Sequence, residues 1–492
     1  MNRSARRSLA AALAVGAALC AASCAVPLAP GYRIVKESRE ARFVAGPAPE
    51  LRIRSRFTLR NSGNSDLSFL DVILPEERAY GRRDLHVEVN GREVTPVNLP
   101  GEYQAEQPNA RRIPLDAPWG RKQTRELTID YAFASPEDPG ARITLSAEAF
   151  HLGSRGWFPL PQPPKHVLAP YPKRPGRLLY TVRVPGDFVV LARGTSQGAR
   201  KDGGELEYRF ELGKADLPPY IVGGRYAAWP ANRAERSTVF WTAQPLQGDP
   251  AAAAERILAA WKILEKNFGP LDKRIAAPHV VESAGVSGQF AGEDGPGAAS
   301  FPGGALVNPA AVSLGVGSEE FLDVVTRALA RDWFGEEIYP APDAELGLGE
   351  GFSEYAMLVV EEARNGAAAR RGRILQYLRE YDEAAKDAAE KPLSMMRMDD
   401  PAPPRRIARA KAALFYVALE DACGEVSMRS GLAHLVSLLR GQEVDYNDLR
   451  AALEQSSGQK LGELFRVWLN RKGIPEDFRN RYHPAAAAEP RK

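Results

Sequence analysis

The hydrophobic pattern of this chain changes its period once, near Asp249. Before that point, short runs alternate between apolar and polar residues, as in Leu51 to Leu59, and end at turn residues such as Asn61 to Asn64. Alternation with period two is typical of strands that bury one face. Similar runs recur at Leu85 to Val89, Glu126 to Phe133, Leu178 to Val184 and Leu206 to Leu212. The sequence therefore predicts an N-terminal β-sandwich-like domain over residues 31–230.

After Asp249, apolar residues recur at helical spacing. The segment Pro250 to Phe268 carries Ile257, Trp261 and Leu264 on one face and stops at Gly269-Pro270, which predicts a helix. Further helices are expected at Glu319 to Phe334, Gly351 to Arg364, Arg371 to Asp387, Arg409 to Ala422, Met428 to Arg440, Tyr446 to Gln455 and Leu461 to Arg471. We therefore expect an α+β protein with a second, mainly helical domain over residues 250–480 and a disordered tail over residues 484–492.

The N-terminus has the features of an export signal. Three arginines, Arg3, Arg6 and Arg7, precede the apolar run Leu9 to Leu19, which has eleven residues. A membrane-spanning helix needs about 20 apolar residues, whereas a run of this length fits the core of a signal peptide. We expect residues 1–23 to be a signal peptide and the protein to be exported.

The signal segment ends in Ala21-Ala22-Ser23-Cys24, which resembles the lipobox of bacterial lipoproteins, although Ala21 stands where such boxes usually have leucine. The resemblance implies that Cys24 is lipidated and becomes the new N-terminus. The expected location is then the bacterial cell envelope, with the protein anchored in a membrane on the periplasmic side or in the outer membrane. Ordinary cleavage within this alanine-rich stretch is the alternative.

Charge and cysteine content exclude several classes of function. The formal net charge is +3, and the three signal-peptide arginines account for all of it, so 3 − 3 leaves a neutral body, which argues against a nucleic-acid partner. Two of the three cysteines lie in the signal region, which excludes a disulfide framework, and Cys423 is expected to be a buried small hydrophobe. No two of the six histidines lie three or four residues apart, so no metal signature is present.

The second half contains the motifs Trp333-Phe334-Gly335 and Gly349-Glu350-Gly351-Phe352. Together they resemble the zinc-site region of the aminopeptidase N family of gluzincin metallopeptidases. The family pattern is H-E-x-x-H-x-W-F-G, followed by Asn-Glu-Gly-Phe, with eighteen residues between the second histidine and the ligand glutamate. Eighteen residues also lie between position 331 and Glu350, which fixes the register. Further matches in family order are Phe268-Gly269-Pro270, Lys391-Pro392-Leu393, Phe465 to Leu469, and Gly473-Ile474-Pro475.

The resemblance implies a thermolysin-like domain, but most of the family's site residues are replaced. In the family register, the two histidine ligands correspond to Arg327 and Arg331, and the glutamate that activates water corresponds to Ala328. Only the ligand Glu350 is kept. The catalytic tyrosine of the family's Tyr-x-Lys-Gly motif falls on Arg409, and the amine-binding glutamate falls on Asp294.

These replacements remove the chemistry that the family implies. Zinc needs neutral imidazole or anionic ligands, whereas a guanidinium stays protonated and offers only donors. Ala328 supplies no general base, a loss that alone costs about 10²- to 10⁴-fold in rate. We therefore predict that the chain holds no zinc or other cofactor and has no peptidase activity.

The arginines suggest a further hypothesis. Two guanidinium groups about 4 Å apart repel by roughly 4 kcal/mol at an effective dielectric near 20, so Glu350 is the expected counter-ion in an Arg327/Glu350/Arg331 cluster. With Arg409 and Asp294 the cleft would carry 3 − 2 = +1 and could bind an acidic ligand. In the alternative, the arginines lie on a solvated helix face, opposite the apolar stripe that includes Phe321, Val325 and Trp333.

The sequence thus predicts a catalytically inactive, aminopeptidase-like pseudopeptidase of the cell envelope that binds a peptide, an acidic ligand or a protein partner. One alternative is a zinc-dependent aminopeptidase with residual activity. Another is a purely structural module, in which substitutions in the cleft would be silent.

Overall fold

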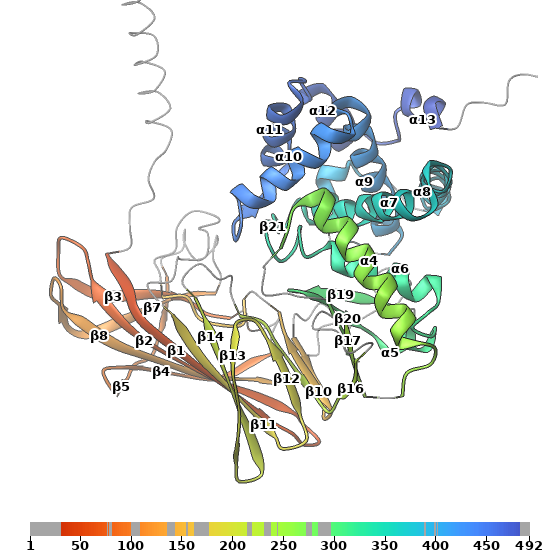
Figure 1. The fold of residues 1–492 in the computed structure, drawn as a ribbon. Helices are drawn as coiled ribbons and strands as arrows, with labels where there is room; N and C mark the ends of the chain where they lie inside the picture. The colour runs from red at the N-terminus through yellow and green to blue at the C-terminus, as the bar shows by residue number, and fades with distance from the viewer. Residues whose placement is uncertain are drawn as a thin grey trace, which may run out of the picture.

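The computed structural model describes residues 31–75, 77, 81–99, 109–134, 143–153, 156–161, 177–213, 219–230, 238–243, 245–271, 278–283, 297–387, 390–397, 400 and 402–482. A sheet-rich N-terminal half is followed by a helical C-terminal half (Figure 1), which confirms the predicted fold class. The signal peptide, Cys24, Asp294 and the tail from residue 484 lie outside the described residues. Among the helices that are described, none is both long enough and apolar enough to cross a membrane.

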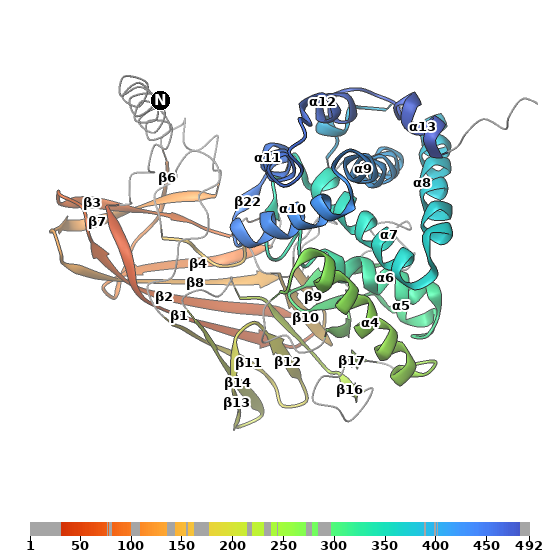
Figure 2. The same cartoon turned by 45° about the horizontal axis from the view of Figure 1, so that its top comes forward.

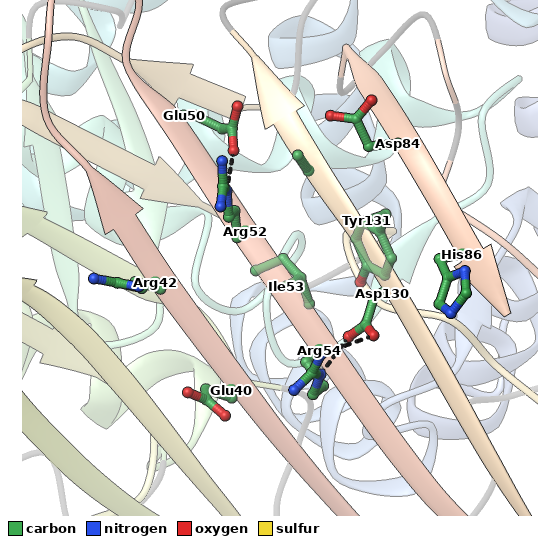
Figure 3. A pocket seen from close by; sticks show the side chains of 11 residues that line it. Glu40, Arg42, Glu50, Arg52, Ile53, Arg54, Asp84, His86, Asp130 and Tyr131 are labelled. Carbon is green, nitrogen blue, oxygen red and sulfur yellow. Dashed lines mark hydrogen bonds and ion pairs between the residues drawn. The ribbon is translucent and has the colours of Figure 1, made fainter. Parts of the chain in front are cut away.

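The N-terminal half is built on an eight-stranded sheet with the order β13-β14-β11-β1-β2-β8-β4-β5, in which β1 and β11 are parallel. The strands are β1 (Tyr32–Val44), β2 (Glu50–Asn61), β4 (Arg82–Val89), β5 (Arg92–Glu93), β8 (Thr124–Ala134), β11 (Leu178–Pro185), β13 (Thr195–Asp202) and β14 (Glu205–Leu212). The alternating runs of the sequence therefore do form strands. Many of their polar residues lie on the outer face, as Arg54 and Asp130 do (Figure 3), although Glu37, Arg39 and Ser55 are buried.

Two smaller sheets supply the rest of this half. One has the order β3-β7-β6 and the other the order β12-β15-β10-β9. Their strands are β3 (Leu67–Ile73), β6 (Val97–Asn98), β7 (Ala110–Trp119), β9 (Ile143–Leu145), β10 (Ala149–Leu152), β12 (Val189–Ala192) and β15 (Ile221–Gly224). Residues of all three sheets share one apolar core, in which the rings of Phe43 and Phe150 stack at 4.9 Å. Packing of sheets across a shared core is the arrangement expected of a sandwich-like domain.

A five-stranded sheet, β16-β17-β18-β20-β19, begins the second half. Its strands are β16 (Ala227–Pro230), β17 (Val239–Thr242), β18 (His279–Glu282), β19 (Ala298–Phe301) and β20 (Gly304–Val307). The hydrophobic pattern does not predict this sheet, because strands of four residues are too short to show a period. The strand β16 precedes the expected boundary at residue 230 but pairs with β17, so it belongs to this sheet.

The helices surround a second large core (Figure 2). They are α4 (Pro250–Phe268), α5 (Pro309–Ser313), α6 (Glu319–Ala330), α7 (Gly351–Asn365), α8 (Ala367–Asp387), α9 (Ala402–Cys423), α10 (Glu425–Leu438), α11 (Tyr446–Ser457), α12 (Gly462–Asn470) and α13 (Glu476–Tyr482). A π-helix, η1 (Glu345–Glu350), a short 3₁₀ turn, η2 (Leu393–Met395), and the strand pair β21 (Tyr339–Pro340) and β22 (Glu443–Val444) complete this half. The bounds of α4 are those predicted, and Asp249 caps it by accepting from the backbone N–H groups of Ala251 and Ala252.

Several details differ from expectation, including the bounds of α8 (Ala367–Asp387), which was expected from Arg371, and of α10 (Glu425–Leu438), which was expected from Met428 to Arg440. Helix α6 ends at Ala330 instead of Phe334, because the chain turns there: the N–H of Glu337 donates to the carbonyl oxygen of Asp332 at 2.8 Å, and Phe334 forms an isolated bridge with Ile338. Helix α9 begins at Ala402 instead of Arg409, since prolines are tolerated in a first helical turn. Cys423 is only half-buried, at the margin of the core.

Candidate functional site

Helix α6 carries the first two arginines of the predicted site. Ser318 caps the helix by accepting from the backbone N–H of Phe321 at 3.2 Å, and Arg331 is the residue at its C-terminal cap. The apolar stripe of the helix is fully buried in the core. Arg327 and Arg331 therefore project from the opposite side, with 17% of each side chain exposed. This exposure contradicts the alternative in which they lie on a solvated face.

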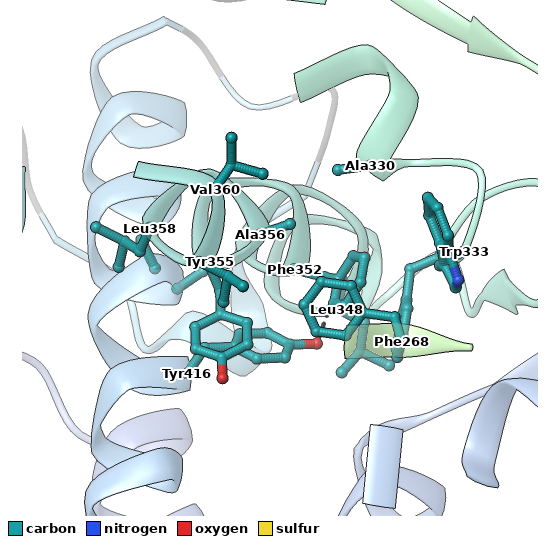
Figure 4. Packing of buried hydrophobic residues seen from close by; sticks show 14 of the residues in the cluster. Phe268, Ala330, Trp333, Leu348, Phe352, Tyr355, Ala356, Leu358, Val360 and Tyr416 are labelled. Atoms are coloured by element: carbon teal, nitrogen blue, oxygen red, sulfur yellow. Dashed lines mark hydrogen bonds between the residues drawn. The ribbon is translucent and has the colours of Figure 1, made fainter. Parts of the chain in front are cut away.

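The motifs that carry the family resemblance meet in the core behind the arginines (Figure 4). The indole N–H of Trp333 donates to the carbonyl oxygen of Gly269 at 2.9 Å. The ring of Phe352 lies 4.8 Å from that of Phe268 and 4.3 Å from that of Phe334. These aromatic contacts hold the end of α6 against the start of α7, which sets the positions of Arg331 and Glu350.

The π-helix η1 positions Glu350 at this site. Glu350 is the last residue of η1, immediately before α7, and it is completely buried. Gly349 allows the close approach of neighbouring groups, since a Cβ there would lie 2.9 Å from Oε1 of Glu345 and 3.5 Å from Nη2 of Arg331. Single-turn π-helices are rare and frequently occur at functional sites.

Arg331 is held by two carboxylates from η1. Its guanidinium contacts Glu345 through Nη2 and Glu350 through Nη1. Glu350, which the sequence register predicts to stand at the position of the family's metal-ligand glutamate, is thus the counter-ion of a guanidinium. Charge-assisted contacts of this kind are the strongest that an arginine makes.

Arg327 pairs with a different carboxylate, Glu354, one turn further along α7. The distance from Nε of Arg327 to Oε1 of Glu354 is 2.7 Å, and the hydroxyl of Tyr377 donates to Oε2 of Glu354 at 2.6 Å. Arg409 lies 3.8 Å from the same carboxylate and 2.9 Å from Glu380, with 18% of its side chain exposed. Two of the three predicted arginines, Arg327 on α6 and Arg409 on α9, therefore meet at Glu354, whereas Arg331 pairs separately with Glu345 and Glu350.

The electrostatics of Glu354 follow from these contacts. Its complete burial would raise the pKa of its carboxyl group, but the nearby charges of Arg327 and Arg409 and the hydrogen bond from Tyr377 lower that pKa to about 2. Glu354 is therefore ionised at neutral pH and acts as the shared anion of the two arginines. A carboxylate with so low a pKa is unsuited to proton transfer near neutrality.

The residues at this site do not fit the zinc ion that the family resemblance implies. Guanidinium groups have no lone pair to give to a metal. Glu350 is the one residue of the family's ligand set that the register retains, and its carboxylate is paired with Arg331. Ala328 is buried and contributes neither a ligand nor a base. Within the part of the chain that the structure describes, no group of three or more His, Cys, Asp or Glu side chains is arranged to hold a metal ion.

Two parts of the sequence-based hypothesis need correction. The expected Arg327/Glu350/Arg331 cluster is divided, because Arg327 reaches Glu354 instead of Glu350. The expected positive cleft is also wrong for the described residues: Arg327, Arg331 and Arg409 face Glu345, Glu350, Glu354 and Glu380, so 3 − 4 = −1. An acidic ligand would have to displace carboxylates that already satisfy the arginines. Asp294, the fourth residue of that hypothesis, lies outside the described residues.

Sequence reasoning missed Glu345, Glu380 and Tyr377 as members of the site. The family register gave no reason to single them out, and only the fold brings α8 and η1 to the arginines. Glu354 was visible as a carboxylate one helical turn after Glu350, which is the spacing that places two side chains on one helix face.

Comparison with known proteins supports the family resemblance. Residues 299–468 match the model of the peptidase family M1 domain. No curated protein matches the chain. Among solved structures, the M1 zinc metallopeptidase from Deinococcus radiodurans is 18% identical, with a TM-score of 0.63, and the match covers 92% of this chain and 96% of that one.

Two ligand complexes of such enzymes are similarly close. A glutamate-to-alanine mutant of a two-domain M1 zinc metallopeptidase bound to L-arginine matches with 19% identity and a TM-score of 0.63, covering 91% of this chain and 97% of that one. The corresponding Deinococcus radiodurans mutant bound to a Tyr-Ser-Ala substrate gives 19% identity, a TM-score of 0.62 and the same coverage. Residues 299–468 are therefore similar to a peptidase family M1 domain, and the chain has the two-domain fold of M1 metallopeptidases.

Proposed function

We propose that this chain is a non-catalytic M1-type protein, a pseudopeptidase of the bacterial cell envelope that is anchored by a lipid on Cys24 and binds a peptide or protein partner. One observation carries the proposal. Partly buried guanidinium groups stand where the register places the family's two histidine ligands, and they are paired with the fully buried Glu350 and Glu354.

Three features of the site together support a loss of catalysis. Arg331 occupies the carboxylate that would bind the metal, Ala328 cannot activate water, and Arg409 replaces the tyrosine hydroxyl with a permanent cation that is engaged by Glu380. Any one of these losses would lower the rate strongly. The ion pairs keep α6, η1, α7, α8 and α9 connected, so the fold of the cleft is retained without a metal.

A peptide or protein is a better candidate partner than a small acidic ligand. Arg327, Arg331 and Arg409 already form ion pairs with carboxylates. The three arginines and their four glutamate partners carry a net charge of −1. Binding of an anion would therefore require breaking buried pairs, which costs several kcal/mol because it leaves uncompensated charges.

The first test is the zinc content of the chain from Cys24→Ser onward, measured by plasma mass spectrometry after dialysis, beside the Glu350→Ala variant. We expect no stoichiometric zinc in either protein. The same preparations, with zinc added, should not hydrolyse aminoacyl nitroanilides above the blank, in an assay in which an active M1 aminopeptidase is the positive control. Stoichiometric zinc that disappears in Glu350→Ala, accompanied by turnover, would contradict the proposal.

The second candidate function is a zinc-dependent aminopeptidase with residual activity. The observations that favour it are the M1 domain match and the retained Glu350. It requires zinc to displace Arg331 from Glu350, so the zinc measurement distinguishes the two functions directly.

The proposed anchor has its own test. Metabolic labelling with a radioactive fatty acid should mark the full chain and should leave the Cys24→Ser variant unlabelled. Labelling of both forms, or of neither, would contradict lipidation at Cys24.

A further inference from the structure

Five basic side chains gather at the end of the eight-stranded sheet where β1 begins; we call this surface the basic end. It consists of Arg33 and Lys36 on β1, Arg60 on β2, and Arg121 and Lys122 in the turn between β7 and β8. Four of the five are exposed, and Arg60 is half-exposed. The strands β1, β2 and β8 run side by side towards this end (Figure 1).

Backbone pairing brings these residues together. Arg33 lies directly opposite Arg60 in the antiparallel pair of β1 and β2. The turn with Arg121 and Lys122 is tied to the end of β2, because the N–H of Lys122 donates to the carbonyl oxygen of Asn61 at 3.0 Å and the N–H of Asn61 donates to that of Gln123 at 3.1 Å. The basic end is thus a defined surface on a rigid sheet.

The cations of the basic end lack acidic partners. None of the five forms an ion pair with any residue in the described ranges, and like charges directly opposite each other destabilise a sheet. On the same face, Arg42 also lies directly opposite Arg52 and Arg183, but these three arginines have acidic partners: Arg42 pairs with Glu205, Arg52 with Glu50 and Arg183 with Glu207. Arg33 and Arg60 differ in that neither has such a partner among the described residues, as expected of a surface that meets an anionic partner.

The acids near the basic end do not neutralise it. Asp66 lies in the turn after β2, and Glu126 lies on β8, where its carboxylate accepts a hydrogen bond from the hydroxyl of Thr58 at 2.8 Å. Five cations and two acids leave 5 − 2 = +3. Between Arg33 and Lys36, the irregular residue Val35 is left out of the strand register and is 44% exposed, which adds an apolar side chain to the surface.

The basic end is also the part of the fold next to the predicted lipid anchor. Cys24 precedes Gly31 by seven residues, and an extended chain spans at most about 3.6 Å per residue, or about 25 Å in total. The carbonyl oxygen of Gly31 accepts from the N–H of Ser62 at 2.9 Å, so the chain enters the sheet at this end. A lipid on Cys24 would therefore hold the basic end close to the membrane surface.

We propose that the basic end binds the anionic phospholipid headgroups of the membrane in which the chain is anchored. This inference rests on the lipid anchor of the proposed function and is independent of the loss of catalysis. The guanidinium and ammonium groups would contact phosphate oxygens, and Val35 would lie against the interface. An acyl anchor combined with a basic patch binds a membrane more firmly than either signal alone, and here the patch also fixes the orientation of the body.

The experiment uses the chain from Cys24→Ser onward, which has no lipid, so that only the surface is tested. Its co-sedimentation is measured with vesicles of phosphatidylcholine and with vesicles of equal parts phosphatidylcholine and phosphatidylglycerol. We expect binding to the anionic vesicles alone and loss of that binding at high salt, because salt screens the attraction. The triple variant Arg33→Glu, Lys36→Glu, Arg60→Glu should bind about 100-fold more weakly, since each cation near an anionic surface contributes about fivefold.

A matched control makes the same change of charge elsewhere. Arg200, Lys201 and Lys262 are exposed cations on β13 and α4, and their triple replacement by glutamate should leave vesicle binding within about twofold of the parent chain. Equal losses in both triple variants, equal binding to the two kinds of vesicle, or no binding to the anionic vesicles would overturn the proposal. Circular dichroism of both variants verifies that they are folded. Fatty-acid labelling at Cys24 is a separate measurement. A basic end that does not bind anionic vesicles can therefore be distinguished from a Cys24 that is not lipidated.

Discussion

An arginine that faces a buried carboxylate satisfies that carboxylate without a metal. At the start of α7, Glu350 and Glu354 are both completely buried, and a buried carboxylate is costly unless a cation or hydrogen-bond donors compensate it. In a zinc enzyme of this fold the metal would supply that compensation for the ligand glutamate. Here Arg331 and Arg327 supply it, and their planar guanidinium groups can donate to more than one acceptor at a time.

Replacing Glu354 should destabilise the fold strongly. In Glu354→Gln, the guanidinium groups of Arg327 and Arg409 lose their shared anion, and removal of one partner of a buried pair costs about 3–5 kcal/mol of unfolding free energy. The measurement is urea unfolding at neutral pH. Glu383→Gln, at an exposed position on α8, is the control and should change stability by less than about 0.5 kcal/mol.

The contribution of Glu354 should also depend on pH. Its pKa in the folded chain, about 2, lies below the ordinary value of 4.5, so its stabilising contribution is complete above about pH 4.5 and is lost as the pH falls towards 2. The difference in stability between the parent chain and Glu354→Gln should therefore shrink over this range. A difference that stays constant from neutral pH down to the acid transition would argue that Glu354 is not held as an ion pair.

At the scale of elements, the site depends on how closely α7 can approach α9. Gly351 begins α7, and a Cβ at this position would lie 2.7 Å from the Cβ of Ala412 and 3.2 Å from the ring of Tyr416 on α9. The π-helix η1 ends at the preceding residue, so this contact also fixes the end of the segment that presents Glu345 and Glu350 to Arg331. Small residues at such a crossing let two helix backbones pack without a gap.

Gly351→Ala should therefore be destabilising, although alanine is the better helix former. The added methyl group must displace α9, and overpacking of a core typically costs about 1–3 kcal/mol. Gly372→Ala, in α8, is the matched control, because its Cβ would meet no atom within 4 Å. That variant should be neutral or up to about 1 kcal/mol more stable. Thermal unfolding of both variants tests the difference, and a stabilised Gly351→Ala would show that the helices separate freely.

At the scale of the whole molecule, each half has its own large apolar core, and a small third cluster joins them. Tyr220 and Val222 from the N-terminal half pack there against Val281, Phe301 and Leu306 of the five-stranded sheet. The rings of Tyr220 and Phe301 have their centroids 5.3 Å apart. The basic end and the ion-pair site lie in different halves, and this cluster is a contact between those halves, so it contributes to the position of the site relative to the basic end.

Phe301→Ala should weaken the connection between the halves. Truncation of a buried phenylalanine typically costs about 3–5 kcal/mol. We expect calorimetry to show a lower melting temperature, with the N-terminal and C-terminal halves unfolding in better separated transitions than in the parent chain. Val426→Ala, at a position that is 81% exposed, should leave the thermogram unchanged. An unchanged thermogram for Phe301→Ala would show that the cluster does not couple the halves.

The sequence by itself determined the order of a β half and a helical half, because long strands and helices carry their period in consecutive residues. It also predicted that Arg327, Ala328, Arg331 and Arg409 stand in the family's catalytic register, since a motif match and the spacing along the chain are enough to propose a register. Chemical type then sufficed to argue against zinc ligation, because no surroundings turn a guanidinium into a metal ligand.

Only the tertiary structure decided which groups meet. Glu354 pairs with Arg327 across 27 residues and Arg409 with Glu380 across 29, and Tyr377 reaches Glu354 from another helix. Because of these long-range pairs, the charged groups at the site sum to −1 instead of the expected +1. The predicted Arg327/Glu350/Arg331 cluster is divided into two separate sets of ion pairs. The tertiary structure also decided the five-stranded sheet, whose strands have only four residues each. It likewise decided the basic end, which combines cations from three separate segments. Spacing along the chain carries no information on such contacts, because they depend on how distant elements pack.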